Sequence, residues 1–131
     1  MPSFLSPLLK EPSRSFRLVN LRTGAIVADR LLPAFESEAR RRGLLAYPSM
    51  PDGAAMVIAP TNAVHTFFMK FAIDLLFVGR DGRVVKARGD VRPWRMSAAW
   101  RGHAVIELEA GALRRISVRV GDQITVLPNQ P

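Results

Sequence analysis

The sequence lacks cysteine and any hydrophobic run long enough to cross a membrane, and each absence removes a class of protein. Without a thiol, the 131-residue chain offers no disulfide, no thiolate metal site and no cysteine nucleophile. The most apolar stretch, residues 72–79, is interrupted by Asp74, whereas a transmembrane helix needs about 18 to 20 apolar residues. The sequence therefore predicts no membrane span and is compatible with a reducing compartment.

Signatures of the common cofactor enzymes are also missing. The chain has no phosphate loop, no dinucleotide fingerprint, no nucleophile elbow and no zinc-protease helix. The apolar residues at its beginning are interrupted by Pro2 and Pro7, and the basic start of a secretory signal is absent. We therefore expect no cofactor and a cytoplasmic location.

Acidic residues are few, and the formal net charge of +8 is carried mainly by arginine. Because guanidinium groups pair well with phosphates, nucleic-acid binding is one hypothesis. Outside residues 40–42 and 114–115, however, the basic residues are scattered and no nucleic-acid motif surrounds them. This distribution favours a solvated basic surface over a dedicated binding face.

The length fits one domain. Proline and serine are frequent in residues 1–15, which predicts an extended leader before a single domain over residues 16–131. One short helix is expected over residues 34–42, because Pro33 suits a first turn and Gly43 suits a helix end. Short β-prone runs predict strands at residues 16–21, 25–28, 54–59, 64–71, 75–78, 84–87, 104–109 and 118–127. Residues 89–102 are expected to form a long loop, and residues 112–117 a helical turn.

Residues 104–109 alternate in a way typical of a half-exposed strand, with Glu107 and Glu109 on the same side. Paired carboxylates can perform acid–base hydrolysis. Alternation on a solvated face explains these two glutamates equally well, and we predict no catalytic residue here.

Several blocks of sequence resemble a known family. They are residues 64–74 (VHTFFMKFAID), 81–85 (DGRVV), 93–95 (PWR) and 107–111 (ELEAG), followed by Gly121-Asp122. Their order and spacing are similar to those of the family called domain of unknown function 192 (DUF192), over roughly residues 25–126. The chain departs from the family's pattern at residues 46–48, where glycine and arginine are usual. The resemblance implies a mainly β fold, a compact β-sandwich or barrel of jelly-roll type with one short helix packed beside it. It implies no activity.

Asp74 lies within an apolar stretch, so its buried charge requires a partner. The cations Lys70, Arg92 and Arg95 are candidates for a buried ion pair, and backbone amides are the alternative. A further interpretation is that Asp74 and Arg95 line a polar pocket for a small anionic or aromatic ligand.

His65 could act as a base, an acid or a metal ligand. With His103 and Asp74 it could form a two-histidine, one-carboxylate centre, but no ligand spacing supports this, and no metal site is predicted. Trp94 could stack on a base or sugar, or clamp its loop onto the core.

The sequence thus favours a small-ligand-binding or interaction module of unknown activity. Its expected ligand-binding residues are His65, Met69, Asp74, Trp94 and Arg95. One alternative is a hydrolase-like or metal-dependent enzyme that uses His65 and Asp74. A second alternative is nucleic-acid binding through the basic surface. No ligand, protein partner or oligomeric state follows from the sequence.

Overall fold

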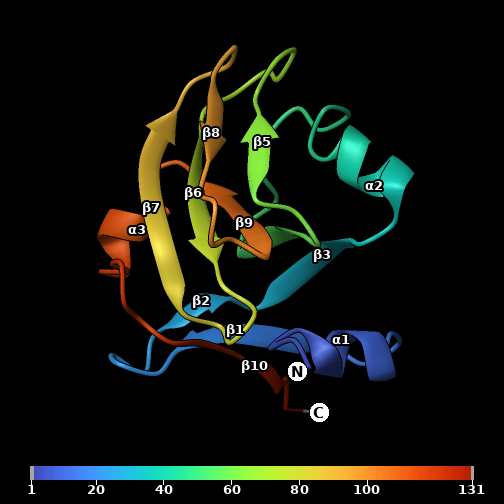
Figure 1. Ribbon diagram of the computed structural model, residues 1–131, viewed down its shortest axis with the longest axis vertical. Helices are drawn as coiled ribbons and strands as arrows, with labels where there is room; N and C mark the ends of the chain where they lie inside the picture. Colours follow the sequence, from blue (N-terminus) through green and yellow to red (C-terminus); the bar gives the residue numbers. More distant parts are fainter. Residues whose placement is uncertain (1, 131) are drawn as a thin grey trace.

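A computed structural model describes residues 2–130, and strands dominate it (Figure 1). The described chain has three short helices, α1 (Ser6–Lys10), α2 (Ser37–Arg42) and α3 (Ala112–Arg115). Its strands are β1 (Phe16–Asn20), β2 (Ile26–Ala28), β3 (Arg30–Ala34), β4 (Ala54–Ile58), β5 (Ala63–His65), β6 (Ile73–Val78), β7 (Val84–Val91), β8 (Met96–Ala98), β9 (Ala104–Glu109) and β10 (Ile124–Pro128). The mainly β class predicted from the sequence is confirmed.

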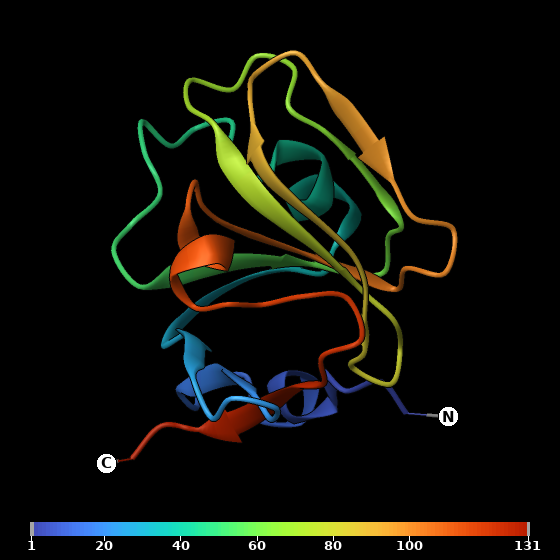
Figure 2. The same cartoon turned by 90° about the vertical axis from the view of Figure 1, so that its left-hand side faces the viewer.

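The strands form three sheets, with orders β10-β1-β2, β3-β4-β9-β6-β7 and β5-β8. The pairing of β3 with β4 is parallel, whereas the other strand pairs are antiparallel. Figure 2 shows the three-stranded sheet on one side of the five-stranded sheet, with α2 and the β5-β8 pair on the other side. Within residues 2–130 these sheets do not close into a barrel.

The five-stranded sheet is covered on both faces, and each face has its own core. In β4, Val57 packs in the first core with Leu18 of β1, whereas Met56 and Ile58 pack in the second. Successive side chains of a strand point to opposite faces, so nearly every position of the central strands β4, β6 and β9 is buried. The continuous apolar run of β4 follows from this requirement, and Asp74 in β6 and Glu107 in β9 are the buried acidic exceptions.

Two sequence predictions near the N-terminus differ from the structure. Residues 2–15 do not form an extended leader, because they contain α1 and Leu5 is buried in the first core; residue 1 lies outside the described residues. The predicted helix over residues 34–42 begins only at Ser37, and Pro33 lies in β3 instead. Because β3 is an edge strand, a residue without a backbone donor is tolerated there.

The predicted strand over residues 64–71 is also too long. Strand β5 ends at His65, and Phe68 has a positive φ of 66°, which a continuous strand does not allow. Its partner β8 lies within residues 89–102, which were expected to be loop throughout. The first hairpin (β1-β2) and the β6-β7 hairpin were predicted correctly.

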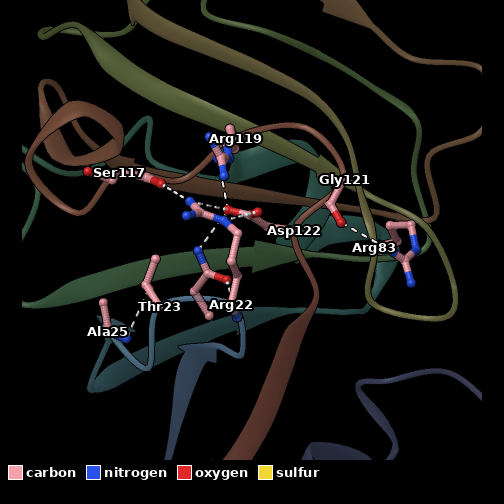
Figure 3. A network of polar contacts seen from close by, with 9 residues as sticks. Arg22, Thr23, Ala25, Arg83, Ser117, Arg119, Gly121 and Asp122 are labelled. Carbon is pink, nitrogen blue, oxygen red and sulfur yellow. Dashed lines mark hydrogen bonds and ion pairs between the residues drawn. The ribbon is translucent and has the colours of Figure 1, made fainter.

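A buried carboxylate joins the two ends of the domain (Figure 3). Asp122 precedes β10 and accepts hydrogen bonds from Arg22 Nε at 2.6 Å, from Asn20 Nδ2 at 2.8 Å and from the backbone N–H of Arg119 at 3.0 Å. The hydrogen bond from Arg22 holds the pKa of Asp122 well below its usual range. The turn after β1 is thereby tied to the segment that leads into β10.

This network predicts a pH-dependent loss of stability. The Asp122→Ala variant is expected to lower the free energy of unfolding at pH 7 by about 2 kcal/mol, because hydrogen bonds to a charged acceptor are lost. Since the folded-state pKa of Asp122 is depressed, its contribution is complete above the unfolded value and is lost as pH falls below about 4. Urea unfolding of both proteins at pH 7 and pH 3 measures this, and a difference that does not shrink at pH 3 would contradict it.

Candidate functional site

A cavity of about 250 Å³ lies between α2, β5 and β9. It combines apolar walls with several ionisable side chains. Its lining residues are Arg40, Arg41, Arg42, Gly43, Leu44, Leu45, Ile58, Thr61, Ala63, Val64, His65, Met69 and Glu107.

Glu107 is the buried acid of this cavity. Its side chain is 3% exposed and makes no hydrogen bond or ion pair within residues 2–130. Burial without a compensating partner disfavours the carboxylate and raises the pKa of Glu107 to about 7. The carboxyl group is therefore divided between its protonated and charged forms near neutral pH.

The prediction of a half-exposed strand is wrong for β9. This strand lies between β4 and β6, and only Glu109 at its end is exposed. Glu107 points toward the same core as Val105, and Ile106 points toward the other. The sequence signal for burial is Val105, an aliphatic residue on the face predicted to be exposed.

Arginine side chains of α2 border the cavity. Arg40 is held in place by hydrogen bonds from its guanidinium group to the backbone oxygen of Phe35 and to Ser37 Oγ. Arg41 and Arg42 are exposed, and neither forms a hydrogen bond or ion pair in the part of the chain that the structure describes. They are the guanidinium groups available to a ligand.

Gly43 ends α2 with φ 47° and ψ −125°, a conformation for which glycine is suited. A Cβ atom built at Gly43 would lie 4.0 Å from Glu107 Oε1. The helix end is thus close to the buried carboxyl group, and the chain continues into Leu44, which packs in the second core.

His65 lies at the edge of the same cavity, at the end of β5. Its Nδ1 accepts a hydrogen bond from the backbone N–H of Phe67 at 3.2 Å, and its ring stacks on the Phe67 ring with centroids 4.8 Å apart. Met69 is buried and supplies apolar wall. The structure therefore brings together two of the residues predicted from the sequence.

Asp74 lies elsewhere, on the face of the five-stranded sheet that packs against α3. Its Oδ2 accepts backbone N–H groups of Gly111 at 3.1 Å and Leu113 at 2.9 Å, and its Oδ1 accepts that of Asp90 at 2.8 Å. The partners of this carboxylate are therefore amides rather than one of the nearby cations. Asp74 lines a different cavity from His65.

Trp94 and Arg95 belong to the loop between β7 and β8, and neither lines the cavity that contains Glu107. The Trp94 ring packs against Phe67 and Phe68. The Arg95 side chain is exposed. Of the five residues predicted as one ligand site, His65 and Met69 line this cavity, Trp94 and Arg95 lie beside it in the neighbouring loop, and Asp74 lines a different cavity.

The metal centre considered from the sequence does not assemble. His103 Nε2 lies 3.0 Å from Ser3 Oγ, near α1, and no group of three or more histidine, aspartate or glutamate side chains within residues 2–130 is arranged to hold a metal ion. Over the same residues, no helix has the length and apolar character needed to cross a membrane.

Comparisons with known proteins agree with the mainly β fold. The model of the DUF192 family, described as uncharacterized ACR, matches residues 22–126. A UPF0127 protein of Thermococcus sibiricus is 29% identical over 113 residues, which cover 82% of this chain and 72% of that protein.

Two crystal structures share the fold. One, from Sinorhizobium meliloti 1021, is described as a candidate transcription regulator, has a TM-score of 0.74 and 21% identity, and the match covers 86% of this chain and 92% of that one. The other, a protein of unknown function from Novosphingobium aromaticivorans, has a TM-score of 0.70 and 20% identity, with coverage of 84% and 82%.

Proposed function

The chain belongs to the uncharacterized DUF192 family, and we propose, from its own geometry, that it binds a small organic anion in the cavity between α2, β5 and β9. The observation that carries this proposal is Glu107, a buried carboxyl group without a protein partner that faces this cavity. Buried polar groups are almost always hydrogen-bonded, and exceptions are concentrated at functional sites.

The chemistry of the lining residues supports a ligand of mixed character. The guanidinium groups of Arg41 and Arg42 suit a carboxylate or similar anion at the rim. Leu45, Ile58 and Met69 suit an apolar body. Glu107, with a pKa of about 7, can donate a hydrogen bond when protonated and accept one when charged. The volume of about 250 Å³ suits a small molecule.

A titration series tests this proposal. The probes are straight-chain monocarboxylates of increasing length and the corresponding primary amides. Binding of each probe is measured by isothermal titration calorimetry and by chemical shifts of the protein's backbone N–H groups. We expect carboxylates to bind and amides to bind at least about tenfold more weakly, because a charge-assisted hydrogen bond contributes on the order of 1.4 kcal/mol more than a neutral one. The shifted amides should belong to the lining residues.

Variants assign the binding to the cavity. The double variant Arg41→Gln/Arg42→Gln is expected to weaken carboxylate binding about tenfold, whereas Arg114→Gln/Arg115→Gln, which removes the same charge from α3, should leave it unchanged. Equal weakening by both double variants, or no binding by any carboxylate, would overturn the proposal.

Other roles proposed from the sequence have less support. His65 and Met69 stay in the proposed site, whereas Asp74 accepts three backbone N–H groups and lines a different cavity, and Trp94 and Arg95 lie outside the proposed one. An acid–base pair of His65 and Asp74 therefore remains only a hypothesis. The absence of cysteine supports a proposed cytoplasmic location.

Nucleic-acid binding is the second candidate, because the net charge is +8 and one protein of similar fold is described as a candidate transcription regulator. Such binding would depend strongly on salt. With several phosphate contacts, affinity for duplex DNA should fall by roughly a thousandfold between 50 and 200 mM salt. Fluorescence anisotropy measures this, and no binding at the lower salt concentration would remove the candidate.

A further inference from the structure

Loops form the end of the molecule that lies farthest from the β10-β1-β2 sheet (Figure 1). Two loops meet there, residues 66–72 between β5 and β6 and residues 92–95 between β7 and β8. Phe68 of the first loop is 69% exposed and Trp94 of the second is 56% exposed. We call these two residues with Phe67 the aromatic tip.

The rings of the aromatic tip pack against one another rather than standing apart. The Trp94 centroid lies 5.7 Å from that of Phe67 in a stacked arrangement and 4.6 Å from that of Phe68 in an edge arrangement. The result is one continuous apolar projection with much of its surface in solvent. Large exposed apolar patches of this kind mark interaction surfaces.

A buried threonine holds the two loops together beneath the rings. Thr66 Oγ1 donates to the backbone oxygen of Arg92 at 2.7 Å and accepts the backbone N–H of Arg95 at 2.9 Å. The backbone N–H of Thr66 donates to the backbone oxygen of Arg95 at 2.8 Å. The backbone oxygen of Thr66 accepts the backbone N–H of Trp94 at 3.1 Å. The projection is therefore built on a fixed base.

The backbone at the tip is strained. Phe68 and Trp94 have φ angles of 66° and 69°, in the left-handed region that bulky side chains rarely occupy. Neither ring is used to fill the core. Strain retained at two adjacent exposed aromatic residues indicates that their outward position has a function.

The two loops of the tip carry basic side chains and no acidic ones, and the exposed Asp90 lies just before the second loop, within β7. No aspartate or glutamate occurs in residues 53–73 or 91–106, which include both loops and strands β5 and β8. Lys70, Arg92 and Arg95 lie in the loops and are exposed. A partner that covers the aromatic tip must therefore bring negative charge around an apolar surface.

We propose that the aromatic tip docks onto an anionic lipid surface. Aromatic rings prefer the boundary between headgroups and acyl chains, and flanking cations are attracted by anionic headgroups. Stacking of nucleic-acid bases requires free ring faces, and the Phe67 ring already stacks on one face of Trp94. The docking is independent of the ligand cavity proposed above.

Vesicle co-sedimentation with the full chain tests the docking. The two probes are vesicles of phosphatidylcholine and vesicles of phosphatidylcholine mixed with phosphatidylglycerol. Because a protein of charge +8 is attracted by any anionic surface, the decisive variants leave the charge unchanged. They are Phe68→Asn/Trp94→Asn, since asparagine tolerates the left-handed backbone, and the control Trp100→Asn, which removes another exposed tryptophan outside the two loops.

We expect the wild-type chain to bind the anionic vesicles and not the neutral ones. The double variant should bind at least about tenfold more weakly because it loses the inserting apolar groups, and Trp100→Asn should bind as the wild type does. The proposal is overturned if wild-type chain fails to bind anionic vesicles, or if the double variant and the control bind equally well. Binding of a single-stranded oligonucleotide through the tip, without vesicle binding, would also overturn it. Far-UV circular dichroism establishes that each variant is folded.

Discussion

Replacing Asp74 with alanine is expected to lower the free energy of unfolding by about 3–5 kcal/mol, because several buried hydrogen bonds to a charged acceptor are lost together. Three backbone N–H groups, those of Asp90, Gly111 and Leu113, donate to this carboxylate. After the substitution these donors would be left without their acceptor beside the first core. The effect arises because one carboxylate joins β6 to the end of β7 and to the start of α3.

Chemical unfolding of Asp74→Ala, Asp74→Asn and Glu109→Ala measures this effect. The stability of Asp74→Asn should lie between those of the wild type and the alanine variant. The asparagine side chain keeps one acceptor oxygen, but its NH2 group faces backbone N–H groups to which it cannot hydrogen-bond. Glu109 is exposed at the end of β9, so Glu109→Ala should change stability by less than about 0.5 kcal/mol. A loss below about 1 kcal/mol for Asp74→Ala would show that the three amides find other acceptors.

The local patterns of the sequence predicted β4 and the β6-β7 hairpin well, because short apolar runs and tight turns depend on residues that are close in sequence. Strand β4 is a short apolar run between turn residues, and the β6-β7 hairpin turns at residues that favour a tight turn. The family resemblance agreed with the mainly β class. Its jelly-roll form stays a prediction, since the described sheets do not form a closed barrel.

Predictions failed where tertiary contacts override local preference. Pro33 looked like the start of a helix, but β3 pairs in parallel with β4, a partner more than twenty residues away whose register is not encoded locally. Leu5 lies in a proline-rich segment, yet the first core provides a site for its side chain. The strand predicted over residues 64–71 ended early because Thr66 bonds to the neighbouring loop.

The candidate site was only partly predictable for the same reason. His65 and Met69 were selected from one stretch of chain, and they do line one cavity. Asp74 follows them closely in sequence, but its position in β6 points it to the opposite face of the sheet from Leu75. Glu107 and Arg42 are far apart in sequence, so only the strand order, with β9 in the centre, places them at the same cavity.

Glu107 leads to the second large effect, a loss of stability as the pH rises. Its pKa is raised from 4.5 to about 7 in the folded chain because of burial. Between these two values the folded state binds more protons than the unfolded state, so the free energy of unfolding falls with increasing pH. The stability associated with the protonated group is fully present below pH 4.5 and is lost as the pH passes 7. The loss amounts to about 3 kcal/mol.

The Glu107→Gln variant should not show this loss, because glutamine keeps a similar shape and does not ionise. The free energy of unfolding of the wild type minus that of the variant should therefore fall by about 2.5 kcal/mol between pH 5 and pH 8. Taking this difference cancels groups common to both proteins, including His103, whose pKa is lowered by burial and whose contribution changes with pH in the opposite direction. Glu109→Gln serves as the exposed control.

If the difference in free energy of unfolding between wild type and Glu107→Gln does not change with pH, the prediction is wrong. Water or a rearranged arginine would then solvate the carboxylate. Carboxylate binding by the Glu107→Gln variant separates a structural from a ligand-related origin of the buried acid. A side chain retained only for packing would be replaced by glutamine or methionine with a gain in stability at pH 8 and no other consequence. If the cavity is a binding site, the same substitution should stabilise the chain while it abolishes the pH dependence of carboxylate binding, and the opposing changes in stability and binding would identify Glu107 as a functional group.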